Sequence, residues 1–299
     1  MARLGNIISY GLVLLVLYEV TNGKPQPVKR ILLPFMALLL VSSPALAAKT
    51  GGTAVATGND ISWPQCGAKL PSGQAFGIVG INDGLANTTN QCLAAELTWA
   101  GTSTGKTAQP KVQVYVNTAN PGGLNTLSWP SDNIDPSGFD TTTNKTNPYG
   151  VCDYSNSAPC AWQYGWNRAN EDITQRLASA STNPASSYIW WLDVETGNTW
   201  DTTIGGVARN DADLEGMTAY FQKASATVGL YSTTSQWQSI AGTVGSGSNL
   251  AGLINWRPGA RTLSAAQSNC LLTSLTPGGK VTIAQYVTSQ VDYDYSCIL

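Results

Sequence analysis

The sequence predicts an α/β protein folded as a single TIM-like (β/α) barrel, irregular in form, with a long loop insertion and disulfides. Short β-branched or aromatic runs alternate with helical or loop segments, which is typical of a largely parallel sheet. The 252 residues that follow an expected export segment match the roughly 250 residues of a closed barrel. A doubly wound open sheet is the alternative, but no glycine-rich phosphate loop follows the first expected strand.

Residues 1–47 are expected to be a signal for export. Their two apolar stretches, 7–18 and 31–41, are each shorter than the roughly 18 to 20 residues of a membrane span. The second stretch follows two basic residues and ends in the small-residue site Ala45-Leu46-Ala47, which is the plan of a secretory signal. We therefore expect cleavage after Ala47. The alternative is an N-terminal anchor built from residues 7–41.

The part of this segment before Val28 is surplus to a secretory signal, and we hypothesise that translation starts at Val28 instead. A short linker is expected at 48–57 and the barrel domain at 58–299.

Seven strands are expected in the domain, with amphipathic helices between some of them. The helices are expected at 91–100, 166–179 and 207–226, where apolar residues recur every three or four positions. The strands are expected at 58–62, 76–82, 111–117, 188–195, 227–231, 250–256 and 281–287, with an eighth candidate at 271–275.

The segment 118–161 interrupts this alternation. It is rich in Asn, Thr, Ser, Pro and Gly and has no sustained periodicity. Long loops of this kind are often functional, and the aromatic residues Trp129, Tyr149 and Tyr154 could face a ligand. The other interpretation is a solvated excursion stapled by two cysteines, and the sequence favours neither.

The composition excludes several classes of mechanism. The chain has no histidine, so it can form neither a Ser/His/Asp or Cys/His nucleophile system nor a histidine metal site. Its formal charge of −2 becomes −5 without residues 1–47, and Lys and Arg do not cluster in the domain. We therefore expect no nucleic-acid partner, and no cofactor or metal. A monomer without a stable membrane anchor is expected after cleavage.

All six cysteines lie beyond residue 47, and an even number in an exported chain favours disulfides. No Cys-x-x-Cys sequence is present, so a zinc site is not expected. The domain is expected to be secreted, either extracellular or at the cell wall. Of about 15 possible pairings, we favour the nearest neighbours, in which each pair closes one loop or ties one strand end: Cys66 with Cys92, Cys152 with Cys160, and Cys270 with Cys297.

Acidic residues are scarce, and several of them lie in or just after expected strands. Asp60 lies in the first strand, Asp83 follows the second, and Asp292 comes just past the last. Asp193 and Glu195 end the fourth strand. Residues two apart on a strand point to the same face, so these two carboxylates are expected to project into one pocket at the barrel mouth.

Crowded carboxylates cannot all ionise easily, so one of them is expected to keep its proton near neutral pH and to serve as a general acid. Without histidine, this arrangement favours cleavage of a glycosidic bond through an oxocarbenium-like state. The ten tryptophans fit the same interpretation because sugar faces stack on aromatic rings, although many of them are expected in the core.

Five motifs occur in order along the domain. They are Asp60-Ile61-Ser62 followed by Gln65, Ile81-Asn82-Asp83-Gly84, Leu192-Asp193-Val194-Glu195, Val228-Gly229-Leu230-Tyr231-Ser232, and Gln285-Tyr286 with Val291-Asp292. In this order and spacing they resemble glycoside hydrolase family 25, the lysozymes or muramidases that hydrolyse the β-1,4 bond between N-acetylmuramic acid and N-acetylglucosamine.

The resemblance implies roles for individual residues. Glu195 would be the general acid, and Asp193 would orient and stabilise the 2-acetamido group of the substrate, with Asp60 and Asp292 as supporting carboxylates. The acetamido oxygen would attack the anomeric carbon, so that no enzyme carboxylate need bond to sugar. The residues expected to bind substrate are Asp83, Tyr115, Tyr231, Trp256, Gln285 and Tyr286.

Some positions depart from the family pattern. The third strand of the family commonly ends Tyr-His-Phe, whereas this chain has Tyr115-Val116-Asn117, and Asp83 stands where the family usually has Glu. We therefore expect a divergent secreted hydrolase of peptidoglycan or a related N-acetylated glycan. The alternative is a cell-wall glycan-binding protein of the same fold without activity, and a third is a structural or adhesive exported protein, supported only by the Ser/Thr/Asn-rich composition.

Overall fold

The computed structural model describes residues 18–21, 24–27, 55–123, 128–288 and 291–298. The chain forms two compact units, Met1–Gly52 and Thr53–Leu299. In the first unit, β1 (Tyr18–Thr21) pairs antiparallel with β2 (Lys24–Pro27). The expected cleavage site at Ala47, both apolar stretches except Tyr18, and most of the expected linker lie outside the described residues. None of the helices in the described ranges is long and apolar enough to cross a membrane.

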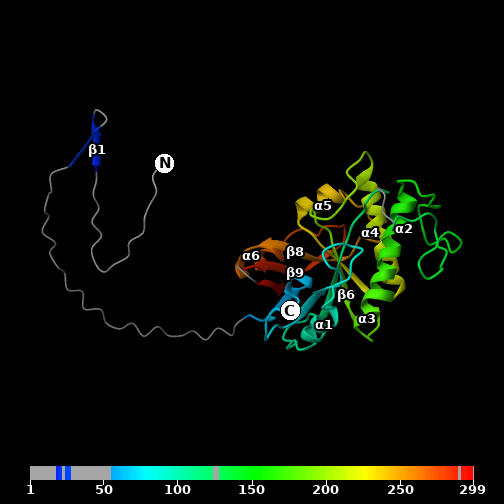
Figure 1. Cartoon of the computed structure of the whole chain (residues 1–299), viewed down its shortest axis with the longest axis horizontal. Helices are drawn as coiled ribbons and strands as arrows, with labels where there is room; N and C mark the ends of the chain where they lie inside the picture. Colours follow the sequence, from blue (N-terminus) through cyan, green and yellow to red (C-terminus); the bar gives the residue numbers. More distant parts are fainter. Residues whose placement is uncertain (1–17, 22–23, 28–54, 124–127, 289–290, 299) are drawn as a thin grey trace. The chain divides into compact units, whose positions relative to one another are not determined.

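The second unit is a closed eight-stranded barrel, which confirms the predicted fold class (Figure 1). Neighbouring strands from β3 to β9 pair in parallel, and β10 closes the barrel by pairing antiparallel with both β9 and β3. The strands are β3 (Thr57–Ile61), β4 (Gly77–Gly80), β5 (Val112–Asn117), β6 (Ile189–Asp193), β7 (Thr227–Tyr231), β8 (Ile254–Ala260), β9 (Lys280–Val287) and β10 (Asp292–Ser296).

The eighth strand was predicted in the wrong place. Residues 271–275 contain only turns and irregular backbone, and Asp292, expected just past the last strand, begins β10. The alternating acids and tyrosines of β10 are typical of a strand that points its acids to one face and its aromatic rings to the other. Because β10 is antiparallel, its first residue lies beside the carboxyl ends of its neighbours, with Asp292 opposite Val287 of β9.

Helices α1 and α4 lie where the sequence predicts them, whereas α2 begins at Ala158, eight residues before the predicted 166–179 and inside the predicted insertion. Helices α5 and α6 were not predicted because seven residues carry little periodicity. The predicted helix at 166–179 spans the end of α2, a π-helical segment Asp172–Leu177, and α3. Short 3₁₀ turns occupy Trp63–Gln65 and Ala185–Ser187. The helices are α1 (Leu93–Gly101), α2 (Ala158–Glu171), α3 (Ala178–Ala180), α4 (Gly206–Lys223), α5 (Thr234–Ile240) and α6 (Leu263–Asn269).

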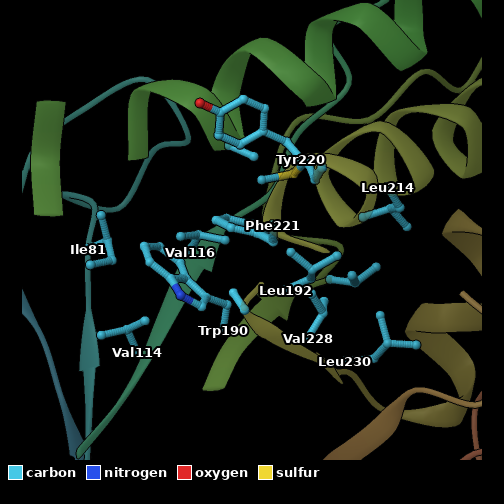
Figure 2. Close-up of a cluster of buried hydrophobic side chains, with 14 of the residues drawn as sticks. Ile81, Val114, Val116, Trp190, Leu192, Leu214, Tyr220, Phe221, Val228 and Leu230 are labelled. Atoms are coloured by element: carbon cyan, nitrogen blue, oxygen red, sulfur yellow. The ribbon is translucent and has the colours of Figure 1, made fainter. Parts of the chain in front are cut away.

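Helices α2 and α4 lie side by side against the barrel (Figure 1). Glycines allow their backbones to touch, since a side chain at Gly165 would collide with the carbonyl oxygen of Asp213, and one at Gly216 with that of Trp162. Beneath them, the outward-facing residues of the strands form the main core, in which Trp190 stacks on Phe221 with 4.5 Å between ring centroids (Figure 2).

The inside of the barrel is filled by a second apolar cluster that includes Phe76, Trp191 and Trp256. Two glycines make room for it, because a side chain at Gly58 would strike the Phe76 ring and one at Gly229 would strike the Trp191 ring. Side chains thus fill the barrel interior beneath its mouth, as is usual for this architecture.

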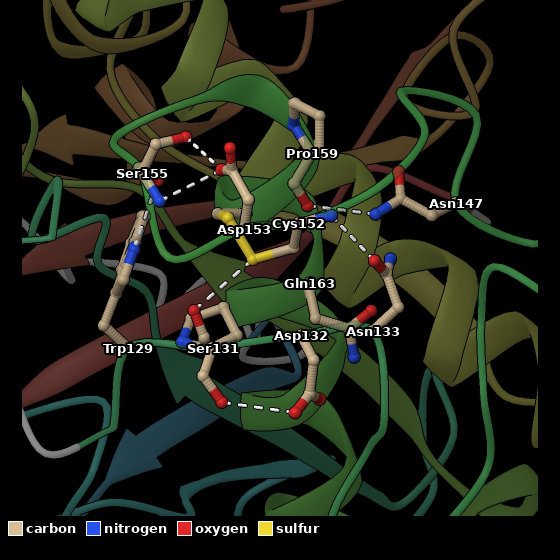
Figure 3. Close-up of a disulfide and its surroundings, with 12 residues drawn as sticks. Trp129, Ser131, Asp132, Asn133, Asn147, Cys152, Asp153, Ser155, Pro159 and Gln163 are labelled. Carbon is tan, nitrogen blue, oxygen red and sulfur yellow. Dashed lines mark hydrogen bonds between the residues drawn. A yellow bond between two sulfur atoms is a disulfide. The ribbon is translucent and has the colours of Figure 1, made fainter.

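The described part of the insertion, 118–123 and 128–161, packs against α2. Cys152 is bonded to Cys160, and its backbone N–H donates to the side-chain oxygen of Asn133 at 2.7 Å (Figure 3). Trp129 is buried and stacks on Tyr164, so it belongs to the core. Tyr149 and Tyr154 are exposed on the insertion. The structure therefore supports a stapled insertion, although a packed rather than a solvated one.

The other two disulfides tie loops to the barrel. Cys66 joins Cys92, linking the turn after β3 to the start of α1, and Cys270 joins Cys297, linking the end of α6 to the end of β10. With Cys152 and Cys160, these are the three nearest-neighbour pairs that the sequence analysis favours.

Candidate active site

A pocket of about 420 Å³ lies at the barrel mouth. The four carboxylates to which the sequence analysis gives catalytic roles, and four of the six expected substrate-binding residues, line this pocket together. Its lining consists of Asp60, Tyr115, Asp193, Glu195, Tyr231, Trp256, Gln285, Val287 and Asp292. A second hollow shares Asp60 and Asp292 with it and extends past Gln65 and Lys69, so the two hollows adjoin.

Two expected substrate-binding residues lie elsewhere. Asp83 is exposed in the loop after β4, where its backbone N–H donates to the Thr88 hydroxyl at 3.0 Å. Tyr286 stacks on Tyr293 with 5.1 Å between centroids, on the outside of the barrel. Strand alternation explains the second case, because Gln285 faces the interior and its neighbour must then face outward. Neither residue lines the pocket.

Asp193, the last residue of β6, is buried at the bottom of the pocket wall. Asn117 lies opposite it on β5 and donates its side-chain Nδ2 to Asp193 Oδ2 at 2.9 Å. Asp193 Oδ1 is buried and has no partner in the protein. Burial, and then the neighbouring Glu195, raise the pKa of Asp193 well above its usual value.

Glu195 lies two residues beyond Asp193 and is half-buried at the pocket rim. Leu192 and Val194, the residues that alternate with these acids, belong to the core outside the barrel, as strand alternation predicts. Gln236 of α5 donates to Glu195 Oε1 at 3.4 Å. The sequence pattern Asp-x-Glu therefore places one enclosed and one accessible carboxylate side by side.

Asp60 of β3 lies across the pocket and is held by a hydrogen-bond relay. Gln285 donates its Nε2 to Asp60 Oδ2 at 2.9 Å, and the Tyr231 hydroxyl donates to Gln285 Oε1 at the same distance. Burial, and then the charge of Asp292, raise the pKa of Asp60 to about 7. Asp292 is also partly buried, and burial raises its pKa.

Asp294 is the site residue that the sequence analysis missed. It is fully buried below Asp292, accepts a hydrogen bond from Trp256 Nε1 at 2.8 Å, and shares a hydrogen bond with the Asp60 carboxyl. Burial, and then Asp60, raise the pKa of Asp294 well above its usual value. The signal was the spacing of Asp292 and Asp294, which repeats the two-residue spacing of Asp193 and Glu195.

Aromatic side chains form one wall of the pocket. The Trp256 ring lies 4.4 Å from that of Tyr231 and 6.3 Å from that of Tyr115, measured between centroids. Burial raises the pKa of Tyr115, whose hydroxyl is hydrogen-bonded to Ser62. Gly80 leaves room for this hydroxyl, because a side chain there would lie 2.7 Å from it.

The arrangement places carboxyls with raised pKa values beside the more accessible Glu195 in one partly enclosed pocket. Such a pocket can donate a proton from one group while another stabilises positive charge. Within the described ranges, no cluster of three or more Cys, Asp or Glu is arranged to hold a metal ion.

No protein-family model and no curated protein sequence matches the chain. Among solved structures, the chain is similar to the bacterial lysozyme from Streptomyces coelicolor, at 14% identity and a TM-score of 0.44, over 82% of this chain and 93% of that one. It is also similar to a muramidase from Acremonium alcalophilum, at 14% identity and a TM-score of 0.44, over 81% and 93%. Likeness at this level does not establish an activity, so function is argued from the pocket itself.

Proposed function

We propose that the domain is a secreted glycoside hydrolase that cuts β-1,4 bonds of peptidoglycan or a related N-acetylated glycan. The observation that carries the proposal is the placement of Asp193 and Glu195 side by side in a pocket at the barrel mouth. Two carboxyl groups in unlike environments are the minimum that glycosidic cleavage requires. The motifs that resemble glycoside hydrolase family 25 support the choice of an N-acetylated glycan.

Glu195 is the general acid in this proposal. It is the accessible member of the pair, so a bound glycosidic oxygen can reach its carboxyl group. In the first step Glu195 gives its proton to that oxygen as the bond to the anomeric carbon breaks. In the second step Glu195, now ionised, takes a proton from the water that attacks the same carbon.

Asp193 assists the substrate's own 2-acetamido group. The acetamido oxygen attacks the anomeric carbon to close an oxazolinium ring, and the amide nitrogen becomes positively charged as it does so. The Asp193 carboxyl, which lines the pocket, is the group proposed to accept the N–H of this amide. Burial and Glu195 raise the pKa of Asp193, so Asp193 is ionised and stabilises the developing charge only at a pH above that raised pKa.

The remaining residues that line the pocket are proposed to bind the sugar. Tyr231 and Trp256 offer aromatic faces for a sugar ring, and Asp60 and Asp292 accept hydrogen bonds from sugar hydroxyls. The adjoining hollow gives room for a polymer that extends beyond one sugar unit. The proposed partner is therefore a glycan chain and not a small sugar.

Export is part of the same proposal. Three disulfides suit an oxidising compartment outside the cytoplasm. Cleavage after Ala47 would release a monomeric domain with a formal charge of −5. Sequencing the N-terminus of the secreted protein tests this step, with Ala48 as the expected first residue.

The activity is tested by incubating the protein secreted from the full chain with purified peptidoglycan and measuring new reducing ends. We expect release by the wild type, loss of release in Glu195→Gln, and unchanged release in Glu215→Gln, a carboxylate on α4 away from the pocket. If wild type and Glu195→Gln bind peptidoglycan equally and neither releases sugar, the domain is the non-catalytic glycan-binding protein instead.

A further inference from the structure

A buried hydrogen-bond chain runs from the helical layer to the proposed catalytic pair. Its inner end is the bond from Asn117 Nδ2 to Asp193 Oδ2. The backbone N–H of Asn117 donates in turn to the side-chain Oδ1 of Asn82 at 2.8 Å. Asn82 follows β4 and is almost fully buried, so one side chain joins the ends of two neighbouring strands.

The outer end of the chain is an ion pair. Asn82 donates its Nδ2 to Asp172 Oδ1 at 3.1 Å, and Arg176 donates its Nη1 to the same oxygen at 2.8 Å. Asp172 is fully buried and Arg176 nearly so. Glu171 accepts from the other end of the Arg176 guanidinium at 3.3 Å, which fixes the guanidinium in place.

The local helix geometry supports a specific role for this ion pair. Asp172 and Arg176 lie in the π-helical segment Asp172–Leu177, which follows α2 directly. A π-helical turn is energetically unfavourable and redirects side chains, and such turns occur frequently at functional sites. Here the segment carries the Asp172 carboxylate that meets Asn82.

We propose that Asp172 and Asn82 are positioning residues that act through Asn117 to hold the Asp193 carboxyl in a fixed orientation at the pocket. The proposal rests on the proposed function for its role in turnover, but its physical content, the geometry around Asp193, is measurable without activity. Asp172 fixes Asn82, Asn82 fixes the Asn117 backbone, and Asn117 engages Asp193 Oδ2. Asp193 Oδ1 is buried, and the side-chain amide of Asn198 also acts on the Asp193 carboxyl from outside this series of hydrogen bonds.

Positioning and simple charge effects predict shifts of opposite sign in the pKa of Asp193. Loss of the Asn117 hydrogen bond destabilises the ionised carboxylate and raises that pKa. Loss of the Asp172 negative charge by itself stabilises the ionised carboxylate and lowers it. The other groups that act on Asp193 are left unchanged by substitutions at Asn117, Asn82 and Asp172. They are the Asn198 amide, which is hydrogen-bonded to the carboxyl, and Asp60, Tyr115, Glu195 and Tyr231.

The test is a titration of Asp193 by ¹³C NMR of the side-chain carboxyl carbon, with the signal assigned by its absence in Asp193→Asn. We expect Asn117→Ala to raise the pKa of Asp193 by about one unit, the size of one hydrogen bond to a charged group. Asn82→Ala and Asp172→Ala should raise it in the same direction by a smaller amount. Asp172→Asn keeps an oxygen acceptor for Asn82 and should not raise it.

Two comparisons separate positioning from a general loss of structure. Asp213→Asn is the control for burial. Asp213 lies on α4 against α2 and is as buried as Asp172, but its side chain makes no hydrogen bond to Asn82, Asn117 or Asp193. This variant should leave the Asp193 titration unchanged. In the Asn117→Ala background, Asp172→Ala should add no further rise. The proposal is overturned if Asp172→Ala lowers the pKa of Asp193. It is also overturned if Asp172→Ala raises that pKa as much in the Asn117→Ala background as it does in the wild type.

Turnover gives a second readout. If the domain cleaves peptidoglycan, the acid limb of the pH profile of kcat/KM should move to higher pH in Asp172→Ala and return in Asp172→Asn. If it does not cleave glycan, the NMR titration still decides whether the chain sets the state of Asp193. The failure of the proposed function and the failure of this inference are thereby distinguished.

Discussion

Two groups of carboxylates face each other across the barrel mouth, and they are built differently. On β6, the enclosed Asp193 carboxyl is hydrogen-bonded by the side-chain amides of Asn198 and Asn117, while Glu195 stands half-buried at the rim. On β3 and β10, Asp60 and Asp294 share a hydrogen bond directly, and Gln285 and Trp256 hold their outer oxygens. The first group leaves Glu195 in reach of a substrate, whereas Asp60 and Asp294 are tied to each other and to Gln285 and Trp256.

The roles of the carboxyls in the pocket therefore depend on their hydrogen bonds and exposure, and not on how many of them there are. A carboxyl–carboxyl hydrogen bond requires one of the two to be protonated, so Asp60 and Asp294 together hold one proton over a wide range of pH. Such a pair is suited to support the barrel mouth and to bind sugar hydroxyls. Glu195, with an accessible carboxyl and no carboxyl partner bonded to it, is suited to transfer a proton.

The largest expected effect is at Glu195. The Glu195→Gln variant should lower kcat by about 10²- to 10⁴-fold, because a positioned general acid contributes that much to bond cleavage. The measurement is the rate of reducing-end release from peptidoglycan at saturating substrate. An equal loss in Asp294→Asn would erase the distinction between the two groups.

Asp193 should follow with a smaller effect. The Asp193→Asn variant should lower kcat/KM by about 10²-fold, since it misplaces and no longer charge-stabilises the acetamido group. Asp83→Asn is the matched control, because Asp83 is an acid next to a barrel strand but lies outside the pocket. A comparable loss of kcat/KM in Asp83→Asn would indicate that Asp83 does bind substrate.

The Asp60 carboxyl should make the free energy of unfolding depend on pH. Its pKa is about 7 in the folded protein against 3.8 as the reference, so the folded state binds more protons between these values. Its contribution to stability is full below pH 3.8 and is lost as the pH rises through 7, with a slope of at most about 1.4 kcal/mol per pH unit. Asp172 and Asp211 also have pKa values raised into this range, so denaturant unfolding from pH 5 to 8 should show a steeper loss of stability in the wild type than in Asp60→Asn. Parallel curves for the two proteins would contradict it.

The smallest effect is expected at Asp294. Asn keeps a side-chain oxygen that can accept the hydrogen bond from Trp256 Nε1, so in Asp294→Asn activity should stay within about threefold of wild type. Asp294→Leu leaves Trp256 Nε1 and Asp60 without this partner and should lower the melting temperature by several degrees. Calorimetry of Asp294→Asn and Asp294→Leu measures the two melting temperatures. Identical values would show that the hydrogen bond from Trp256 to residue 294 does not stabilise the fold.

Much of the fold follows from local sequence. Runs of β-branched and aromatic residues were sufficient to predict seven of the barrel strands, and strand alternation was sufficient to place Asp193 and Glu195 on one face. The eighth strand was missed because Asp-Tyr-Asp-Tyr alternates two polar types and lacks an apolar face, and its partners β3 and β9 lie far away in the sequence. Tyr286 was assigned to the pocket because its motif was transferred as a unit, although adjacent residues on a strand cannot share a face.

The sequence alone excludes histidine chemistry, places acids in or just after the strands, and favours disulfides among the six cysteines, with nearest-neighbour pairing as one of about 15 possibilities. Only the tertiary structure decided which acids meet. Closure by β10 brings Asp294 to Asp60 across more than 230 residues of chain, and the π-helical turn brings Asp172 to Asn82. These contacts join segments that are distant in sequence, and the pKa of each carboxyl depends on them, because burial and neighbouring charge are properties of the folded state.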